Sequence, residues 1–372
     1  MPLPPRPTLL AGLLLALASS LSTAPAQAQV GRSVLTLAGG PVALSYPTDA
    51  VATPQRMGPF EVEIAPGAAP RPGPRRLVVM SHGTAGSALP DQALASALAK
   101  AGFVVAQPLH AGDNHLDSHQ AGPAAFRTRP KEVLRLIDAL AGDPAWGPRL
   151  ALDQVGVHGM SAGGVTGLAL AGAQWRTLGL VQHCQQHLEE DIGFCFNGAL
   201  TAGQQAARRA SYERARGVPE AFLPAELTRW EGGRTPPADA AAQPVAPFDP
   251  RPDPRIAVVT LAVPVAALFS PDSLARIRIP VGVLGAERDE LLLPAFHSRH
   301  VLRHCGACTS LGELPGAGHF DVLSPWPAEL AAQVAAQQAR GGLPVPGFDP
   351  AERRAAVARI VDFHRRVLQP QP

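Results

Sequence analysis

Residues 159–163, Gly-Met-Ser-Ala-Gly, have the G-x-S-x-G pattern of a nucleophile elbow. In this motif a sharp turn between a strand and a helix exposes the serine hydroxyl, and a glycine on each side leaves room for the turn. An apolar segment at residues 153–158 precedes the motif, and an alanine- and glycine-rich stretch follows to about residue 173. This context predicts that Ser161 is a nucleophile. The alternative is a tight glycine turn that contains an incidental serine.

An acid and a base follow at later predicted strand ends. The apolar run at residues 281–284 leads through a short turn to Asp289, and the glycine-bearing turn at residues 316–318 leads to His319. The chain order Ser161, Asp289, His319 is the order of the α/β-hydrolase triad, whereas the chymotrypsin and subtilisin families use other orders. We therefore expect these residues to be catalytic. The alternative for His319, one of 12 histidines, is a surface position without a role.

Three other carboxylates compete with Asp289 for the role of the triad acid. Glu287 and Glu290 are its neighbours, and Asp272 follows an earlier predicted strand. Asp289 is favoured because it comes directly after a strand and before the apolar residues 291–294, which could hold its loop over the sheet. Asp272 follows Ser270 and Pro271, where a helix start would place an aspartate for structural reasons alone.

A turn with the sequence SHGTAG, at residues 81–86, follows the predicted strand at residues 77–80. Such a turn can direct a backbone N–H group at the negative charge that develops on an acyl oxygen during nucleophilic attack. We assign the two oxyanion donors to the N–H groups of Thr84 and Ala162. The alternative is that these glycines only turn the chain.

A second polar cluster lies at residues 110–119. Its imidazoles and carboxylates are dense enough to be considered as metal ligands, and its members are His110, Asp113, His115, Asp117 and His119. We favour a polar loop at the rim of the active site, held by its own hydrogen bonds, because a serine elbow mechanism requires no metal. The sequence thus predicts no metal and no cofactor.

The elements that would position these residues alternate between short apolar runs and amphipathic stretches, which is typical of a parallel sheet with crossover helices. Strands are predicted at residues 77–80, 103–107, 153–158, 256–261, 281–284 and 311–314. Helices are predicted at residues 92–101, from Pro130 to 140, from 162 to 173 and at 350–368. Residues 174–255 lose this periodicity and accumulate prolines, so we interpret them as an insertion within one domain of residues 29–372.

Composition and charge exclude other classes of protein. The chain has 36 glycines and 40 prolines among 372 residues, which no long helical bundle would tolerate. Its formal net charge is +2, so there is no electrostatic case for a nucleic-acid partner. Residues 1–28 combine one arginine, an apolar run and a small-residue end, as in a secretory signal peptide. We expect cleavage after Ala28, a periplasmic or secreted protein, and no transmembrane segment in the mature chain.

Export makes disulfides the default state of the four cysteines. Pairing Cys184 with Cys195 and Cys305 with Cys308 closes the shortest loops, so it is favoured among the three possible connectivities. A rival interpretation is that His183 and His187 join Cys184 and Cys195 as metal ligands, but that spacing matches no common zinc pattern.

The chain resembles exported bacterial α/β-hydrolases described as predicted dienelactone hydrolases, and more loosely the platelet-activating factor acetylhydrolases. The matching motifs are SHGTAG at residues 81–86, HAGDN at 110–114, Arg129-Pro130, GMSAGG at 159–164, GAERD at 285–289 and GAGH at 316–319. This resemblance spans about residues 46–323 and implies the α/β-hydrolase fold. It departs from true dienelactone hydrolases at Ser161, where those enzymes have cysteine.

The resemblance and the predicted triad together imply hydrolysis of a small-molecule carboxylic ester. Two alternatives remain open at this point, an exported peptidase or amidase that uses the same triad, and a binding protein that keeps the fold without catalysis. The residue types at all three triad positions favour an enzyme over a binding protein.

Overall fold

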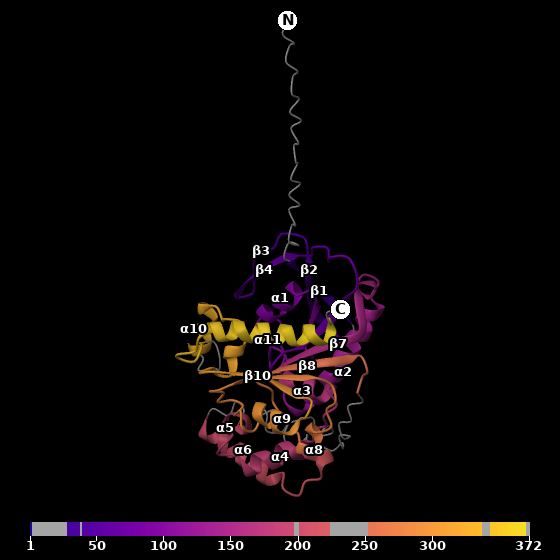
Figure 1. Ribbon diagram of the computed structural model, residues 1–372. Helices are drawn as coiled ribbons and strands as arrows, with labels where there is room; N and C mark the ends of the chain where they lie inside the picture. Colours follow the sequence, from indigo (N-terminus) through magenta and orange to yellow (C-terminus); the bar gives the residue numbers. More distant parts are fainter. Residues whose placement is uncertain (2–27, 38, 197–200, 224–251, 337–342, 370–372) are drawn as a thin grey trace.

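The computed structural model describes residue 1 and residues 28–37, 39–196, 201–223, 252–336 and 343–369. Most of the predicted signal peptide, residues 2–27, lies outside these described residues. The described part of the chain forms a central sheet with helices on both faces (Figure 1). No helix among these residues is long and apolar enough to cross a membrane.

The sheet has ten strands in the order β10-β9-β8-β7-β5-β6-β2-β1-β4-β3. The strands are β1 (Gln29–Leu37), β2 (Gly40–Thr48), β3 (Thr53–Met57), β4 (Phe60–Pro66), β5 (Arg75–Ser81), β6 (Val104–Pro108), β7 (Leu150–Met160), β8 (Ile256–Ala262), β9 (Val281–Ala286) and β10 (Cys308–Leu314). Strands β5 to β10 are parallel, and β2 joins β6 in antiparallel pairing. The sheet is therefore mixed but mostly parallel, with its parallel strand ends meeting at one edge.

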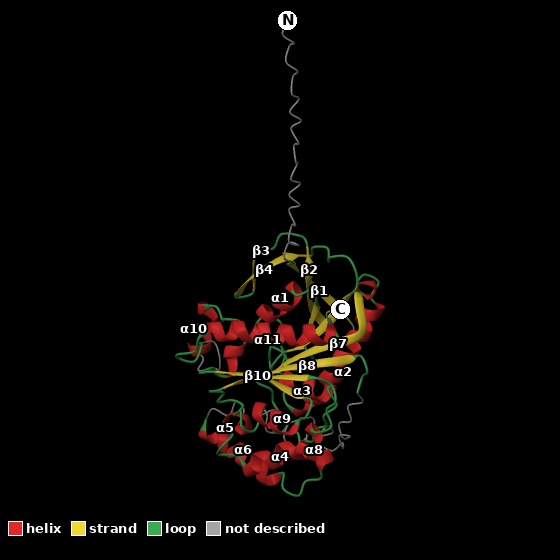
Figure 2. Cartoon of the chain, viewed as in Figure 1, coloured by secondary structure: helices red, strands yellow, loops and turns green. Residues whose placement is uncertain are grey.

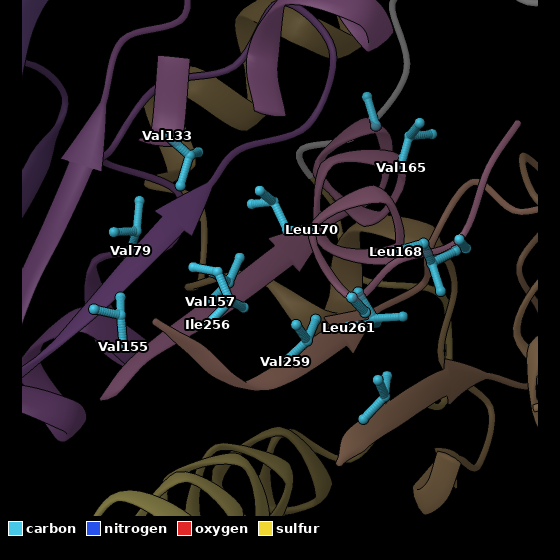
Figure 3. Close-up of a cluster of buried hydrophobic side chains, with 14 of the residues drawn as sticks. Val79, Val133, Val155, Val157, Val165, Leu168, Leu170, Ile256, Val259 and Leu261 are labelled. Atoms are coloured by element: carbon cyan, nitrogen blue, oxygen red, sulfur yellow. The ribbon is translucent and has the colours of Figure 1, made fainter. Parts of the chain in front are cut away.

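Helices cover the sheet on both faces, as Figure 2 shows with the strands in yellow between red helices. Helices α1 (Gln92–Lys100) and α11 (Pro350–Leu368) contact each other and share one apolar core. Helices α2 (Pro123–Gly142), α3 (Ala162–Leu170) and α9 (Ser298–His304) contribute to the core on the opposite face. Figure 3 shows side chains of that second core, among them Leu168 and Leu170 of α3 and Val157, Val259 and Leu261 of the sheet.

The predicted strands at residues 77–80, 103–107, 153–158, 256–261, 281–284 and 311–314 all match strands of the structure within a few residues. The helix predicted over residues 350–368 is confirmed. The start predicted at Pro130 is wrong, because α2 begins at Pro123 and contains Pro130 in its interior. Pro123 lies in the first turn of α2, a position that suits proline. The helix continues past Pro130, and the side chains of Phe126 and Arg129 before it are buried.

The predicted insertion contains helices α4 (Thr177–Gln186), α5 (Ile192–Phe196) and α6 (Ala202–Arg214). They lie at the opposite end of the molecule from β3 and β4 (Figure 1). Residues 197–200 and 224–251 of this segment lie outside the described residues. The short helices α8 (Pro271–Leu274) and α10 (Ala328–Ala336) complete the α-helices of the described chain.

Both favoured disulfides are present. Cys184 is bonded to Cys195, which ties α4 to α5, and Cys305 is bonded to Cys308 at the start of β10. The rival metal site at His183 and His187 is therefore wrong, because the sulfur atoms it would need are already consumed. A disulfide stabilises the fold mainly by restricting the unfolded chain.

A buried series of hydrogen-bonded side chains connects α11 to the sheet. The Thr260 hydroxyl of β8 lies 2.9 Å from His158 Nδ1 of β7 and 2.9 Å from His364 Nε2 of α11. Burial lowers the pKa of His158 from 6.5 to about 4 and that of His364 from 6.5 to about 3. Both imidazoles are thus neutral in the folded protein over a range of pH in which they are protonated in the unfolded chain.

We predict that the free energy of unfolding decreases as the pH falls from about 6.5 toward about 4, because only the unfolded state takes up these protons. By pH 5 each histidine should contribute a loss of about 2 kcal/mol. His364→Gln removes one titrating group and should flatten this dependence in urea denaturation measured between pH 7 and pH 5. The matched control is His119→Gln at an exposed imidazole. An unchanged pH dependence in His364→Gln would contradict the assignment.

Candidate active site

Ser161 lies at the sharp turn between β7 and α3. Its backbone is in a strained conformation, with φ of 54° and ψ of −115°. Both flanking glycines are required because other backbone atoms lie very close to them. A Cβ atom on Gly159 would lie 2.1 Å from the Gly163 carbonyl oxygen. A Cβ atom on Gly163 would lie 1.9 Å from the carbonyl oxygen of Ser81. The glycine pattern therefore serves to pack this turn against the end of β5.

His319 and Asp289 lie next to Ser161 in a hydrogen-bonded chain. The Ser161 hydroxyl is 3.0 Å from His319 Nε2, and His319 Nδ1 is 2.8 Å from Asp289 Oδ2. Because the carboxylate accepts the Nδ1 proton, Nε2 is left as the acceptor for the serine hydroxyl. Asp289 is buried, and its Oδ1 accepts hydrogen bonds from the N–H groups of Leu291 and Leu292. These contacts fix the orientation of the carboxylate and, through it, of the imidazole.

The structure brings none of the three competing acids to His319. Asp272 is exposed in the first turn of α8, where the Ser270 side chain provides the N-cap. Glu287 accepts a hydrogen bond from the Gly316 N–H, and Glu290 is exposed. Among the four carboxylates considered from the sequence, Asp289 is the one within hydrogen-bonding distance of the imidazole.

Thr84 lies beside Ser161, on the turn that follows β5. The neighbouring Gly83 is close enough that a Cβ atom there would lie 3.4 Å from the Ser161 Cβ. Within the described part of the chain, the N–H groups of Thr84 and Ala162 donate to no acceptor, and Thr84 lines the same cavity as Ser161. Within that part, the Thr84 N–H is therefore unpaired beside the cavity, and the Ala162 N–H is unpaired directly after Ser161.

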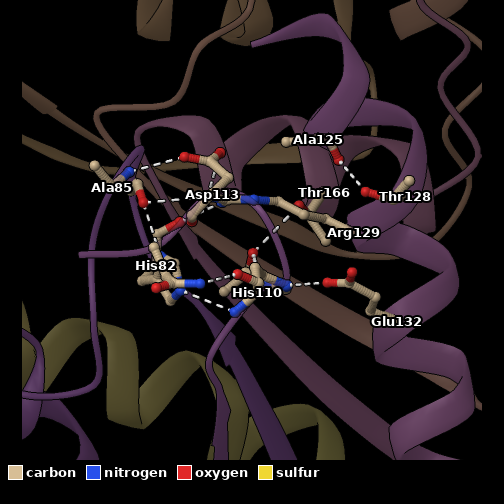
Figure 4. Close-up of polar contacts among 12 residues, drawn as sticks. His82, Ala85, His110, Asp113, Ala125, Thr128, Arg129, Glu132 and Thr166 are labelled. Atoms are coloured by element: carbon tan, nitrogen blue, oxygen red, sulfur yellow. Dashed lines mark hydrogen bonds and ion pairs between the residues drawn. The ribbon is translucent and has the colours of Figure 1, made fainter. Parts of the chain in front are cut away.

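A buried ion pair holds the turn that carries Thr84 (Figure 4). Arg129 of α2 donates to Asp113 Oδ2 at 2.7 Å, and it also donates to the carbonyl oxygens of His82 at 2.5 Å and Gly83 at 3.2 Å. The other oxygen of Asp113 accepts from the Ala85 N–H at 2.8 Å. The pair thus fixes the backbone on both sides of Thr84. Sequence reasoning missed this role of Arg129, which it noted only as part of a motif.

His82 and His110 form the lower part of the same network (Figure 4). His82 Nδ1 donates to the Gly83 carbonyl oxygen at 2.7 Å, and its Nε2 accepts from the His110 N–H at 3.3 Å. His110 Nδ1 is 2.6 Å from Glu132. Burial, the neighbouring His110 and the Arg129 guanidinium hold the pKa of His82 well below its usual range. Both imidazoles are built into the support of the turn.

The polar cluster at residues 110–119 separates into parts with different surroundings. His110 and Asp113 are buried in the network above, whereas His119 pairs with Asp117 on the surface. His115 is exposed and lines the cavity. No group of three or more metal-ligating side chains is assembled among the described residues. The surface part of the loop is thus held by its own hydrogen bonds, whereas His110 and Asp113 are held by Glu132 and Arg129 of α2.

Ser161 and His319 open into a cavity of about 780 Å³. Its walls come from distant parts of the chain, including Phe60 of the β3–β4 hairpin and Phe194 of the insertion. The predicted insertion is held here by Asp191, whose Oδ2 lies 2.9 Å from His183 Nε2 and 3.0 Å from His297 Nε2. The cavity therefore depends on segments at both ends of the sheet.

No match was found among protein-family models or among curated proteins. Among solved structures, the chain is similar to a ferulic acid esterase from Streptomyces cinnamoneus, with 18% sequence identity and a TM-score of 0.55. The match covers 94% of this chain and 93% of that chain. Together with the mostly parallel sheet and the elbow at Ser161, it establishes the α/β-hydrolase fold that the sequence predicted. The resemblance to predicted dienelactone hydrolases stays a prediction.

We predict that Arg129→Met lowers kcat/KM by about 10²-fold, because the backbone around Thr84 loses its anchor. The same change leaves Asp113 buried without its partner, which should cost about 3 to 5 kcal/mol of stability. The double variant Arg129→Met/Asp113→Leu removes both charges and should regain much of the melting temperature but little activity.

This comparison separates positioning from stability. Rates of p-nitrophenyl ester cleavage and melting temperatures measured on the same preparations provide the test. If activity returns along with stability in the double variant, Arg129 serves only the fold.

Proposed function

We propose that the protein is a serine hydrolase that cleaves carboxylic esters through an acyl-enzyme intermediate. The observation that carries this proposal is the hydrogen-bonded chain from Asp289 through His319 to Ser161, which ends in an open cavity. In this assignment Ser161 is the nucleophile, His319 the general base and Asp289 the residue that orients the imidazole. The proposed reaction needs no metal or cofactor.

The proposed reaction proceeds in two halves. His319 Nε2 takes the hydroxyl proton of Ser161 as its Oγ attacks the ester carbonyl, and the N–H groups of Thr84 and Ala162 stabilise the resulting oxyanion. The imidazolium then gives its proton to the leaving alcohol, and the acyl group stays on Ser161. Water, deprotonated by the same imidazole, attacks this ester, and the acid product leaves with Ser161 restored.

Two further features support an ester as the substrate. The structural neighbour is itself an esterase, and the motifs around Ser161 and His319 are similar to those of predicted dienelactone hydrolases with serine in place of cysteine. We place the chain in that family as a proposal. We also propose that it acts outside the cytoplasm as a periplasmic or secreted enzyme, a setting in which its two disulfides would persist.

We predict that Ser161→Ala abolishes labelling by a fluorophosphonate and lowers ester hydrolysis by about 10⁴- to 10⁶-fold. The fold should persist, because the substitution removes one oxygen atom and no core contact. Labelling measured by mass spectrometry and turnover of p-nitrophenyl esters from acetate to palmitate provide the test. The matched control is Ser87→Ala, at a serine that lines the same cavity outside the proposed triad. Labelling that survives in Ser161→Ala would move the nucleophile elsewhere.

We predict that Asp289→Asn lowers turnover by about 10⁴-fold, because the amide keeps the shape of the side chain but favours the wrong imidazole tautomer. Asp272→Asn, at an exposed aspartate on α8, should keep the wild-type rate. Both variants are compared by kcat at saturating substrate and by melting temperature. The reverse pattern would assign the acid to the earlier strand.

A further inference from the structure

A carboxylate outside the proposed triad lines the cavity of Ser161. Asp91 directly precedes α1, is 8% exposed, and is the acidic side chain among the described residues that line this cavity. The proposed ester hydrolysis gives it no task, because Asp289 already serves His319. A buried carboxyl in a substrate cavity therefore needs its own explanation.

The protein makes no use of this carboxyl in capping its own helix. An aspartate at the N-cap commonly accepts a hydrogen bond from the first turn, but the Asp91 side chain makes no such bond. The Ala93 N–H instead donates to Ser324 Oγ at 3.0 Å, and the Ser324 N–H donates to the Pro90 carbonyl oxygen at 2.8 Å. Within the described chain, no hydrogen bond or ion pair engages the Asp91 side chain.

An unpaired carboxyl at this depth is unfavourable for the folded protein. Burial raises the pKa of Asp91 from 3.8 to about 7, and no neighbouring charge contributes to this shift. Neither oxygen is among the fully enclosed polar atoms that lack a partner, and Asp91 is one of the residues that line the cavity. The missing partner is thus a group that enters the cavity.

The walls of this cavity include several apolar side chains, some of them aromatic. Leu89, two residues before Asp91, packs in one cluster with Phe60 and Leu330. Phe320 follows His319, and its ring centroid lies 6.1 Å from that of Trp326. All five of these side chains line the cavity. Flat, apolar walls of this kind favour a planar hydrocarbon ring.

A hydroxyl and an ammonium are two groups of a ligand that could donate a hydrogen bond to Asp91. They differ in how many donors must be satisfied. An ammonium brings three N–H donors, whereas Leu89, Phe60, Leu330 and Trp326 offer no side-chain acceptor. These side chains would accept none of the remaining donors of an ammonium, so its desolvation would stay partly uncompensated beside them. A hydroxyl brings one donor and is satisfied by one carboxyl.

We propose that Asp91 accepts a hydrogen bond from a hydroxyl group on the aromatic ring of the substrate, and so selects esters of hydroxyaryl compounds. This inference rests on the proposed ester hydrolysis at Ser161. Asp91 acts by binding and has no part in the proton transfers assigned to His319.

The test compares esters that differ in one group on the ring, hydroxyl, methoxy or hydrogen, at the ortho, meta and para positions. One series carries the ring in the acyl half, as methyl arylpropenoates, and the other carries it in the alcohol half, as benzyl acetates. In at least one series, the wild-type protein should cleave a hydroxyl ester with a kcat/KM about tenfold or more above its methoxy counterpart. The absence of this preference in both series overturns the inference without any variant.

Two substitutions then locate the preference. Asp91→Leu removes both oxygens and should bring the hydroxyl-to-methoxy ratio to within about twofold of one, whereas Asp91→Asn keeps a carbonyl acceptor and should retain part of it. The melting temperature of Asp91→Leu should rise, because an unpaired buried carboxyl has been removed. The control Asp362→Asn, at an exposed position of α11, should keep the wild-type ratio.

Labelling by a fluorophosphonate separates the two proposals. If the wild-type protein is not labelled and cleaves none of the esters, the proposed function fails and the inference about Asp91 fails with it. If labelling and cleavage are present but Asp91→Leu keeps the full hydroxyl preference, only the inference about Asp91 is overturned.

Discussion

The close backbone approach at the elbow is the constraint on which the rest of the site depends. The turn at Ser161 can form only because Gly159 and Gly163 lack a Cβ atom, which would otherwise collide with the backbone of Gly163 and Ser81. This contact packs the start of α3 directly against the end of β5. The turn that carries Thr84 follows β5 immediately, so the same contact places the proposed nucleophile and the proposed oxyanion donors side by side. Strain at Ser161 is offset by the packed strands around it.

Two sets of buried polar groups hold the segments that lie on either side of Ser161. On the side of the proposed oxyanion donors, the pair of Arg129 and Asp113 holds the backbone from His82 to Ala85. On the side of the proposed base, Asp289 is held by two backbone N–H groups and so holds His319. In both places, hydrogen-bond donors hold a carboxylate in one orientation. The carboxylate in turn holds a second group, which is the backbone of the turn for Asp113 and the imidazole of His319 for Asp289. Such preorganisation is what electrostatic stabilisation of a transition state requires, because nothing has to reorient as charge develops.

The sequence predicted those parts that are encoded in short local patterns. Strands β5 to β9 contain buried apolar runs, and the proposed triad residues follow strand ends or glycine turns, so each could be found without knowing what it contacts. Strands β1 to β4 were missed because they lack such runs: β2 includes Pro41 and Pro47, and β3 is half exposed. The role of Arg129 could not be predicted either, since it depends on meeting Asp113 from another loop. A signal was present in hindsight, because an arginine on the buried face of an apolar helix implies a buried acid.

Asp91 differs from Asp113, Asp191 and Asp289, which are also buried, in the partners of its carboxyl group. Asp113 is paired with Arg129, Asp191 with His183 and His297, and Asp289 with His319 and backbone N–H groups. In each of these the cost of burial is offset by partners within the fold. Within the described residues the Asp91 side chain has no such partner, and at the start of α1 it is Ser324 that accepts a hydrogen bond from the Ala93 N–H. An apolar residue at this position would make the fold more stable, so the retained carboxyl fits a task in the cavity.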